Sequence, residues 1–293
     1  MGASEGLDMQ KSRLAWGGLF LGGAIASFNL SDLPARLFNA LAAEPTQLRE
    51  DVAYGPLARQ RLDIYEPTGA RRRGLVVFFY GGGWTSGEKW MYRFVGAALA
   101  ARGYRTVIPD YRLYPDVRFP AFMEDAALAY RWAAQAAGDE PIVLAGHSAG
   151  GHVAALLALD GRWIGEAPRP AGVVGLAGPY AFDPTTWPST KDIFAPAAAH
   201  PDSARPVAFV TPQSPPMLLT RGAEDDVVAP YNAEELAKAL TAAGVPVENK
   251  LYPGLGHVAL ILAFARPLRW RAPALEDALA FIGQVTGNIT APR

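Results

Sequence analysis

The stretch PIVLAGHSAGGHVAALLAL, residues 141–159, decides the fold that this sequence predicts. It begins with an apolar run of strand length, and the alanine-rich run that follows has the length of a helix. Ser148 stands between the two in a Gly-x-Ser-x-Gly pattern. Glycines on both sides let strand and helix approach closely, so that a serine at this turn projects beyond the sheet. The pattern alone is common, but this strand-to-helix context predicts that Ser148 is a nucleophile rather than a packing residue.

Strands and helices alternate along the rest of the chain. Short strands are predicted within 51–67, around Gly55-Pro56, and apolar runs of strand length occupy 74–80, 104–110, 141–146, 172–178, 215–222 and 245–253. Helical patterns occupy 91–102, 120–137, 149–160, 231–243 and 272–285. Strands that are apolar on both faces and separated by helices predict an α/β fold with a mostly parallel central sheet and helices on both faces. Such sheets bind ligands at the carboxyl ends of their strands.

Composition limits the classes of partner and chemistry. Lys and Arg total 27 against 28 Asp and Glu, so the net charge of −1 provides no field that would attract nucleic acid. The chain has no cysteine, which excludes disulfides, thiolate metal sites and a cysteine nucleophile. The four histidines show no paired metal-ligand spacing. We therefore expect no metal and no cofactor.

One domain is predicted over 51–293, with a proline-rich excursion at 179–216. The excursion lacks the apolar residues for a core of its own, so we expect it to lie over the strand ends. It contains one predicted short helix, at 185–194.

Residues 1–50 form a separate N-terminal segment in this interpretation. Residues 14–30 carry no charge and follow two basic residues, and Ala24-Ile25-Ala26 precedes Ser27. This order predicts a signal peptide or anchor at about 11–26, followed by a capping helix. Export to the periplasm or medium, or anchoring to a membrane through this segment only, is then expected. The alternative is a cytoplasmic protein whose N-terminal segment shields an apolar pocket.

A serine nucleophile needs a histidine as base. His257 follows the last predicted strand, where a loop leaves the carboxyl edge of the sheet. His147 flanks the serine and is expected to point away from it, and His152 lies one turn down the helix. His200 falls in the excursion, where a surface position is expected. His257 is therefore the predicted base.

The acid that orients this base should come from the loop after the preceding strand. That loop holds Glu224, Asp225 and Asp226 in succession. The spacing from the strand favours Asp225, with Asp226 as the alternative. The resulting chain order is Ser148, Asp225, His257, which is nucleophile, acid, histidine.

A glycine run follows an earlier strand, in VVFFYGGGWTSG at 76–87. Only glycine lets main-chain N–H groups turn toward a substrate oxygen without an intervening side chain. A phosphate-binding loop is disfavoured because no Gly-Lys-Ser/Thr follows. The loop is therefore a predicted oxyanion hole, and the amide of Ala149, at a helix N-terminus, can donate to the same oxygen.

Six motifs stand in a familiar order: YGGGW, DYRLYP, FPAFMEDA, GHSAGGH, GAEDDVV and YPGLGH. Over about residues 50–285 the sequence resembles the α/β-hydrolase superfamily, and within it the hormone-sensitive-lipase-like and BD-FAE-type carboxylesterases. The resemblance implies a serine ester hydrolase whose oxyanion hole uses Gly82, Gly83 and Ala149. It also implies structural roles for Asp110 and Asp125.

Tyr80 stands where the family usually has histidine before the glycines. That histidine generally orders the loop, and a tyrosine hydroxyl could replace it as a hydrogen-bond donor. Tyr80 and Trp84 are the predicted substrate-binding residues. Aromatic residues on other loops (Trp90, Tyr114, Tyr180 and Trp187) suggest an aromatic, apolar pocket.

The predicted function is a carboxylesterase acting on short-chain esters through an acyl-enzyme. One alternative is an arylformamidase-type amide hydrolase. A second is a ligand-binding homologue without catalysis.

Overall fold

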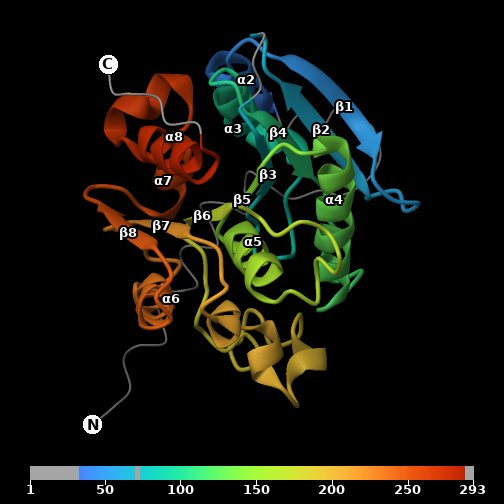
Figure 1. The fold of residues 1–293 in the computed structure, drawn as a ribbon, viewed down its shortest axis with the longest axis vertical. Coiled ribbons are helices and arrows are strands. Elements are labelled where there is room, and N and C mark those ends of the chain that lie inside the picture. Colours follow the sequence, from blue (N-terminus) through green and yellow to red (C-terminus); the bar gives the residue numbers. More distant parts are fainter. Residues whose placement is uncertain (1–32, 70–72, 288–293) are drawn as a thin grey trace.

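An eight-stranded sheet organises the fold (Figure 1). The computed structural model describes residues 33–69 and 73–287. The sheet order is β1-β2-β4-β3-β5-β6-β7-β8, in which β1 and β2 pair antiparallel, as do β2 and β4, and all other neighbours pair parallel. The strands are β1 (Gln47–Ala53), β2 (Arg61–Glu66), β3 (Leu75–Phe79), β4 (Arg105–Pro109), β5 (Ile142–His147), β6 (Gly172–Leu176), β7 (Met217–Gly222) and β8 (Val247–Tyr252). The predicted α/β fold with a mostly parallel sheet is confirmed.

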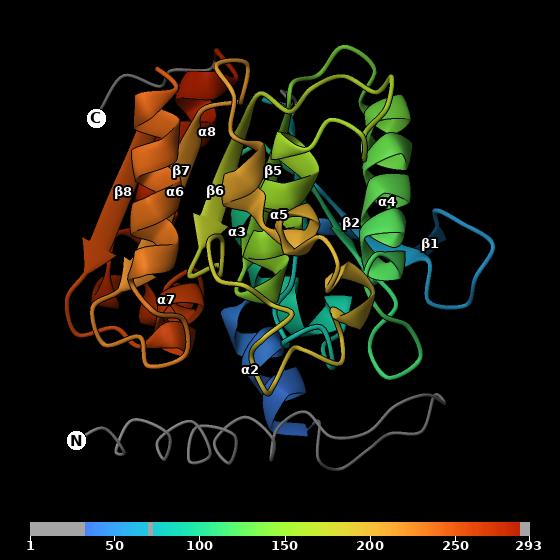
Figure 2. The same cartoon turned by 90° about the horizontal axis from the view of Figure 1, so that it is seen from below.

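Helices cover both faces of the sheet, as predicted (Figures 1 and 2). On one face lie α4 (Ala121–Ala137), α5 (Ala149–Leu159) and α6 (Tyr231–Ala242), and on the other lie α3 (Arg93–Ala100) and α8 (Ala274–Val285). Every residue of β3, β4, β5 and β6 is buried, because these strands are covered from both sides. This explains their continuous apolar runs.

A helix, α2 (Leu33–Ala42), lies where the sequence predicts a capping helix, and its capping role stays a prediction. It packs against α3 through an edge-to-face contact of Phe38 with Phe94, at 5.6 Å between ring centroids. The Asn39 side chain accepts a hydrogen bond from the main-chain N–H of Phe94 at 3.1 Å. The predicted signal peptide or anchor at 11–26 lies outside the described residues. None of the helices in the described part of the chain combines the length and apolar character needed to cross a membrane.

The excursion at 179–216 differs from its predicted form. The predicted helix at 185–194 is wrong, because these residues form turns around Pro188, whose ring and missing N–H disrupt a helix. Short 3₁₀ helices follow instead, η3 (Ala195–Ala197), η4 (Pro201–Ala204) and η5 (Pro206–Phe209). The last of these packs against α5.

Short helices elsewhere were not predicted. They are η2 (Lys89–Tyr92), α7 (His257–Leu262) and η6 (Arg266–Arg271). The first precedes α3 directly, and α7 begins at the predicted base.

Candidate active site

Ser148 occupies a strained turn between β5 and α5. Its φ of 55° and ψ of −124° lie in a region that non-glycine residues rarely adopt. Glycine is required on either side, because a Cβ at Gly146 would lie 2.2 Å from the oxygen of Gly150, and one at Gly150 would lie 2.0 Å from the oxygen of Phe79. The main-chain N–H of Ser148 donates to the oxygen of Leu176 at 2.8 Å. The surroundings thus fix a backbone conformation that the serine would not adopt alone.

His257 and Asp225 form a buried pair. Their side chains are 8% and 2% exposed, and Nδ1 of His257 lies 2.9 Å from Oδ2 of Asp225. The other carboxylate oxygen accepts the main-chain N–H groups of Val227 and Val228, each at 2.9 Å. A carboxylate only accepts, so Nδ1 carries a proton, and in the neutral imidazole Nε2 is left as an acceptor.

The pair also sets the charge of the acid. Burial alone would raise the pKa of Asp225, but the hydrogen bond and charge of His257, with the two main-chain donors, hold that pKa below its usual range. Asp226, the alternative acid, is exposed. The structure brings Asp225, not Asp226, to the imidazole.

The imidazole lies next to the serine turn. The ring of His257 packs against the ring of His147, which immediately precedes Ser148, with 4.9 Å between centroids. Of the remaining histidines, His152 is buried and hydrogen-bonded to the main-chain oxygen of Ala204 at 2.8 Å. His200 is exposed.

The glycine loop packs directly on the serine turn. A Cβ placed on Gly81 would lie 3.0 Å from the Cβ of Ser148. Gly82 and Gly83 have positive φ values of 137° and 59°, which other residues rarely adopt. Within residues 33–69 and 73–287, the main-chain N–H groups of Gly82, Gly83 and Ala149 have no hydrogen-bond acceptor. Three donors in this part of the site are therefore available to a ligand oxygen.

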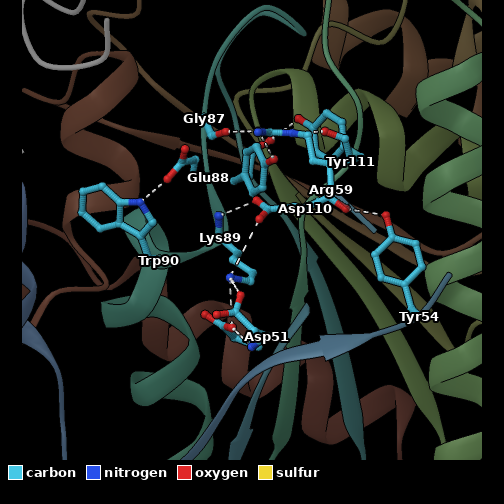
Figure 3. A network of polar contacts seen from close by, with 11 residues as sticks. Asp51, Tyr54, Arg59, Gly87, Glu88, Lys89, Trp90, Asp110 and Tyr111 are labelled. Atoms are coloured by element: carbon cyan, nitrogen blue, oxygen red, sulfur yellow. Dashed lines mark hydrogen bonds and ion pairs between the residues drawn. The ribbon is translucent and has the colours of Figure 1, made fainter. Parts of the chain in front are cut away.

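Arg59 contacts both ends of this loop. Figure 3 shows its guanidinium between Gly87 and Tyr111. Its guanidinium donates to the hydroxyl of Tyr80 at 3.2 Å, just before the glycines, and to the main-chain oxygen of Gly87, just after them. It also donates to the main-chain oxygen of Tyr111 at 2.7 Å. Since Arg59 contacts both ends of the loop at once, it limits how far they can separate.

A cluster of charged side chains follows the glycine loop, around Lys89. Asp110 accepts the main-chain N–H of Lys89 at 2.8 Å, and the ammonium of Lys89 lies 2.7 Å from Asp51 and 3.3 Å from Asp63. Burial raises the pKa of Asp110 to about 6, against the opposing charges of Arg59 and Lys89. The pKa of Asp110 is therefore shifted in the opposite direction to that of Asp225.

Asp125 is likewise an interior, structural residue. Its carboxylate pairs with the guanidinium of Arg112 at 2.8 Å and accepts from the side chain of Gln60 at 2.7 Å. The charge of Asp125 is thereby balanced within the fold.

The Tyr80 side chain is 0% exposed, stacks on Tyr111 with 4.7 Å between centroids, and accepts a hydrogen bond from Arg59 through its hydroxyl. These contacts support the loop, as expected at this position. The substrate-binding role of Tyr80 stays a prediction. Trp84 is 3% exposed and packs against Phe194 with 5.0 Å between ring centroids. Its substrate-binding role stays a prediction.

Two of the other aromatic residues differ widely in burial, and a shared aromatic pocket stays a prediction. Tyr180 is 1% exposed and Trp187 is 40% exposed, one in the core and one in solvent. In the described part of the chain no group of three or more His, Asp or Glu side chains is placed to hold a metal ion.

The chain is similar to known hydrolases. A family described as having the alpha/beta hydrolase fold matches residues 76–261. Esterase LipC of Mycobacterium tuberculosis is 30% identical over 268 residues, covering 81% of this chain and 65% of that protein. Isoprenylcysteine alpha-carbonyl methylesterase ICME of Arabidopsis thaliana is 27% identical over 274 residues, covering 83% of this chain and 63% of that one. The matched region therefore spans less than two thirds of either relative.

Solved structures share the fold. Esterase B of Lactobacillus rhamnosis superposes with a TM-score of 0.72 at 21% identity, covering 95% of each chain.

Proposed function

Because the chain belongs to the family with the alpha/beta hydrolase fold, we propose that it is a serine carboxylesterase that hydrolyses short-chain carboxylic esters. The observation that carries the proposal is the pair of His257 and Asp225, in which the neutral imidazole keeps Nε2 as an acceptor and the ring packs beside the turn that carries Ser148. Similarity to proteins named as esterases supports the same class of reaction.

The first step forms an acyl-enzyme. His257 takes the hydroxyl proton of Ser148 while the serine oxygen attacks the ester carbonyl carbon. Asp225 keeps the imidazole in the Nδ1–H tautomer and stabilises the imidazolium that forms. The proton then passes from Nε2 to the leaving alcohol oxygen as the carbon–oxygen bond breaks.

The second step releases the acid. His257 deprotonates a water molecule that attacks the acyl carbonyl, and the serine oxygen leaves with that proton. In both steps the tetrahedral oxygen carries negative charge, which the N–H groups of Gly82, Gly83 and Ala149 are free to stabilise. Preorganised donors of this kind contribute roughly 3–4 kcal/mol each in hydrolases.

Short acyl groups are proposed because aromatic side chains already fill the space behind Trp84. The rings of Phe122, Phe182 and Phe194 lie 5.0 to 6.4 Å from the Trp84 ring between centroids. A long acyl chain would have to displace this packing, at a cost of several kcal/mol per large side chain.

The test replaces the nucleophile. Ser148→Ala should lower kcat for p-nitrophenyl butyrate by about 10⁵-fold or more and abolish labelling by a fluorophosphonate probe. The matched control is Ser189→Ala, an exposed serine in the excursion, which should leave both unchanged. Hydrolysis by Ser148→Ala at the parental rate would exclude the proposal. A series of p-nitrophenyl esters should show kcat/KM falling as the acyl chain lengthens beyond butyrate.

Two alternatives predict other outcomes. An arylformamidase-type hydrolase would cleave N-formylkynurenine faster than p-nitrophenyl butyrate and would still label at Ser148. A ligand-binding homologue would neither label nor turn over.

Export or membrane anchoring through residues 11–26 is proposed on the sequence pattern alone, as is one domain over 51–293. Mass spectrometry of the protein made in a bacterial host tests the former. An intact N-terminus in the membrane-free fraction would contradict it.

A further inference from the structure

His147 uses both of its ring nitrogens in the interior of the site. Nδ1 lies 3.1 Å from the hydroxyl oxygen of Tyr92, and Nε2 lies 3.1 Å from the main-chain oxygen of His257. The same tyrosine hydroxyl accepts the main-chain N–H of Gly81 at 3.1 Å. His147 is 2% exposed and Tyr92 is 5% exposed. Gly81, Tyr92, His147 and His257 are therefore joined by one continuous run of hydrogen bonds, here called the relay, which is shielded from water.

The groups at the two ends of the relay limit where the protons of His147 and Tyr92 can lie. The main-chain N–H of Gly81 can only donate, and the main-chain oxygen of His257 can only accept. Nε2 of His147 must therefore carry a proton, which it donates to the main-chain oxygen of His257. In the neutral imidazole Nδ1 is then an acceptor, so the Tyr92 hydroxyl, which accepts from Gly81, donates its own proton to Nδ1. The opposite tautomer of the neutral ring would place Nε2 and the His257 oxygen, two acceptors, face to face.

His147 is neutral because its ring is buried. Burial, together with the charge of His257, lowers the pKa of His147 to about 3. Its tautomer is the opposite of that in His257, where Nδ1 carries the proton toward Asp225.

The relay joins three segments that the proposed reaction must align. Gly81 opens the glycine loop, His147 precedes Ser148, and His257 is the proposed base. We propose that Tyr92 and His147 are positioning residues, which fix the glycine loop and the His257 main chain against the serine turn. The inference rests on the proposed function only for its kinetic consequence. Neither residue is a catalytic residue, because neither acts on the reacting atoms.

The kinetic test removes one hydroxyl. Tyr92→Phe keeps the ring that packs against Phe78 and Phe94. It should lower kcat about tenfold with KM changed less than about twofold, because a displaced oxyanion donor affects the transition state more than the bound ester. Tyr130→Phe is the matched control. It also removes a buried hydroxyl, bonded to the main-chain oxygen of Pro168, but on α4 and away from the serine, so kcat should stay at the parental value.

A double variant tests whether the two residues act together. His147→Gln keeps an amide that can donate toward the oxygen of His257 but loses the acceptor for Tyr92. In that background Tyr92→Phe should cost clearly less than its tenfold effect in the parent. Independent, multiplying effects of the two substitutions would overturn the relay.

The nitrogen chemical shifts of His147 report the proton positions in the relay and do not depend on enzymatic activity. In protein labelled with ¹⁵N-histidine, with the resonances assigned by His147→Gln, His147 should show the Nε2–H tautomer and should not titrate between pH 5 and 8. Tyr92→Phe should shift the Nδ1 resonance, whereas Tyr130→Phe should not. An Nδ1–H tautomer, or titration near the ordinary value of histidine, would overturn the inference. If the parent neither labels with fluorophosphonate nor hydrolyses esters, the proposed function fails while these shifts still decide the relay.

Discussion

The two halves of the site beside Ser148 are held in different ways. On one side, the glycine loop is fixed by charged side chains from other segments, with Arg59 on its two ends and Asp110 on the N–H of Lys89. On the other side, the loops after β7 and β8 are joined mainly by their own main chains. The N–H of Ala223 donates to Tyr252 at 2.9 Å, and that of Glu224 donates to Leu255 at 3.0 Å.

The difference follows from what each loop must present. The glycines that offer main-chain N–H groups to a substrate have no side chains of their own with which to hold the loop. Side chains from other segments therefore hold the loop in position, and several of them contribute. The loops after β7 and β8 present one carboxylate and one imidazole. There the two side chains hold each other directly, through the hydrogen bond between Asp225 and His257.

The largest effect is therefore expected from Asp225→Asn. The amide would favour the wrong imidazole tautomer and could not stabilise the imidazolium, so kcat should fall by about 10⁴-fold. Steady-state kinetics with p-nitrophenyl butyrate measures this. Asp226→Asn removes a charge from the adjacent, exposed position and should leave kcat within about twofold. If Asp226→Asn were the more damaging substitution, the proposed acid would be wrong.

The main strands and helices could be predicted from the sequence because each is long and uniform in pattern. β5 and α5 join at a motif that fixes both the end of the strand and the start of the helix. The helix α7 could not, since HVALIL is a short apolar run that periodicity does not separate from a strand. The helix expected at 185–194 does not form, because Pro188 interrupts the segment.

Within the site, the sequence predicts residues that stand at strand ends in fixed order. Asp225 and His257 each follow a strand, so their meeting depends only on a parallel sheet. Arg59, by contrast, precedes β2 and reaches the glycine loop only because β2 pairs with β4, a register that no local pattern reveals. The support that Tyr80 gives the loop through Arg59 is therefore visible only in the structure.

The two buried aspartates should respond oppositely to pH. Asp110 has a raised pKa of about 6 against an unfolded value of 3.8, so the folded protein binds more protons in that window. Its contribution to stability is present below about pH 4 and is lost as pH rises through 6. Asp225 has a lowered pKa, and its contribution is lost instead as pH falls.

Urea unfolding of Asp110→Asn checks the first of these. The free energy of unfolding of the parent, relative to the variant, should fall by about 2 kcal/mol between pH 4.5 and 7.5. Asp116→Asn, at an exposed position, should show no such trend. A constant difference between parent and Asp110→Asn across this range would mean that Asp110 is no harder to ionise in the fold than in the unfolded chain.

The smallest effect is expected where the glycine loop has the most supports. Tyr80→Phe removes the hydroxyl from Arg59 but keeps the ring stacked on Tyr111. Arg59 still donates to the main-chain oxygens of Gly87 and Tyr111, so the loop keeps most of its anchors. One hydrogen bond to a charged group contributes about 1.5–3 kcal/mol to stability, of which only a fraction should reach the transition state, giving a loss in kcat of about threefold. If Tyr80→Phe instead lowered kcat by nearly 10⁴-fold, as expected for Asp225→Asn, the glycine loop would depend on this one contact. The contrast between the two halves of the site would then not hold.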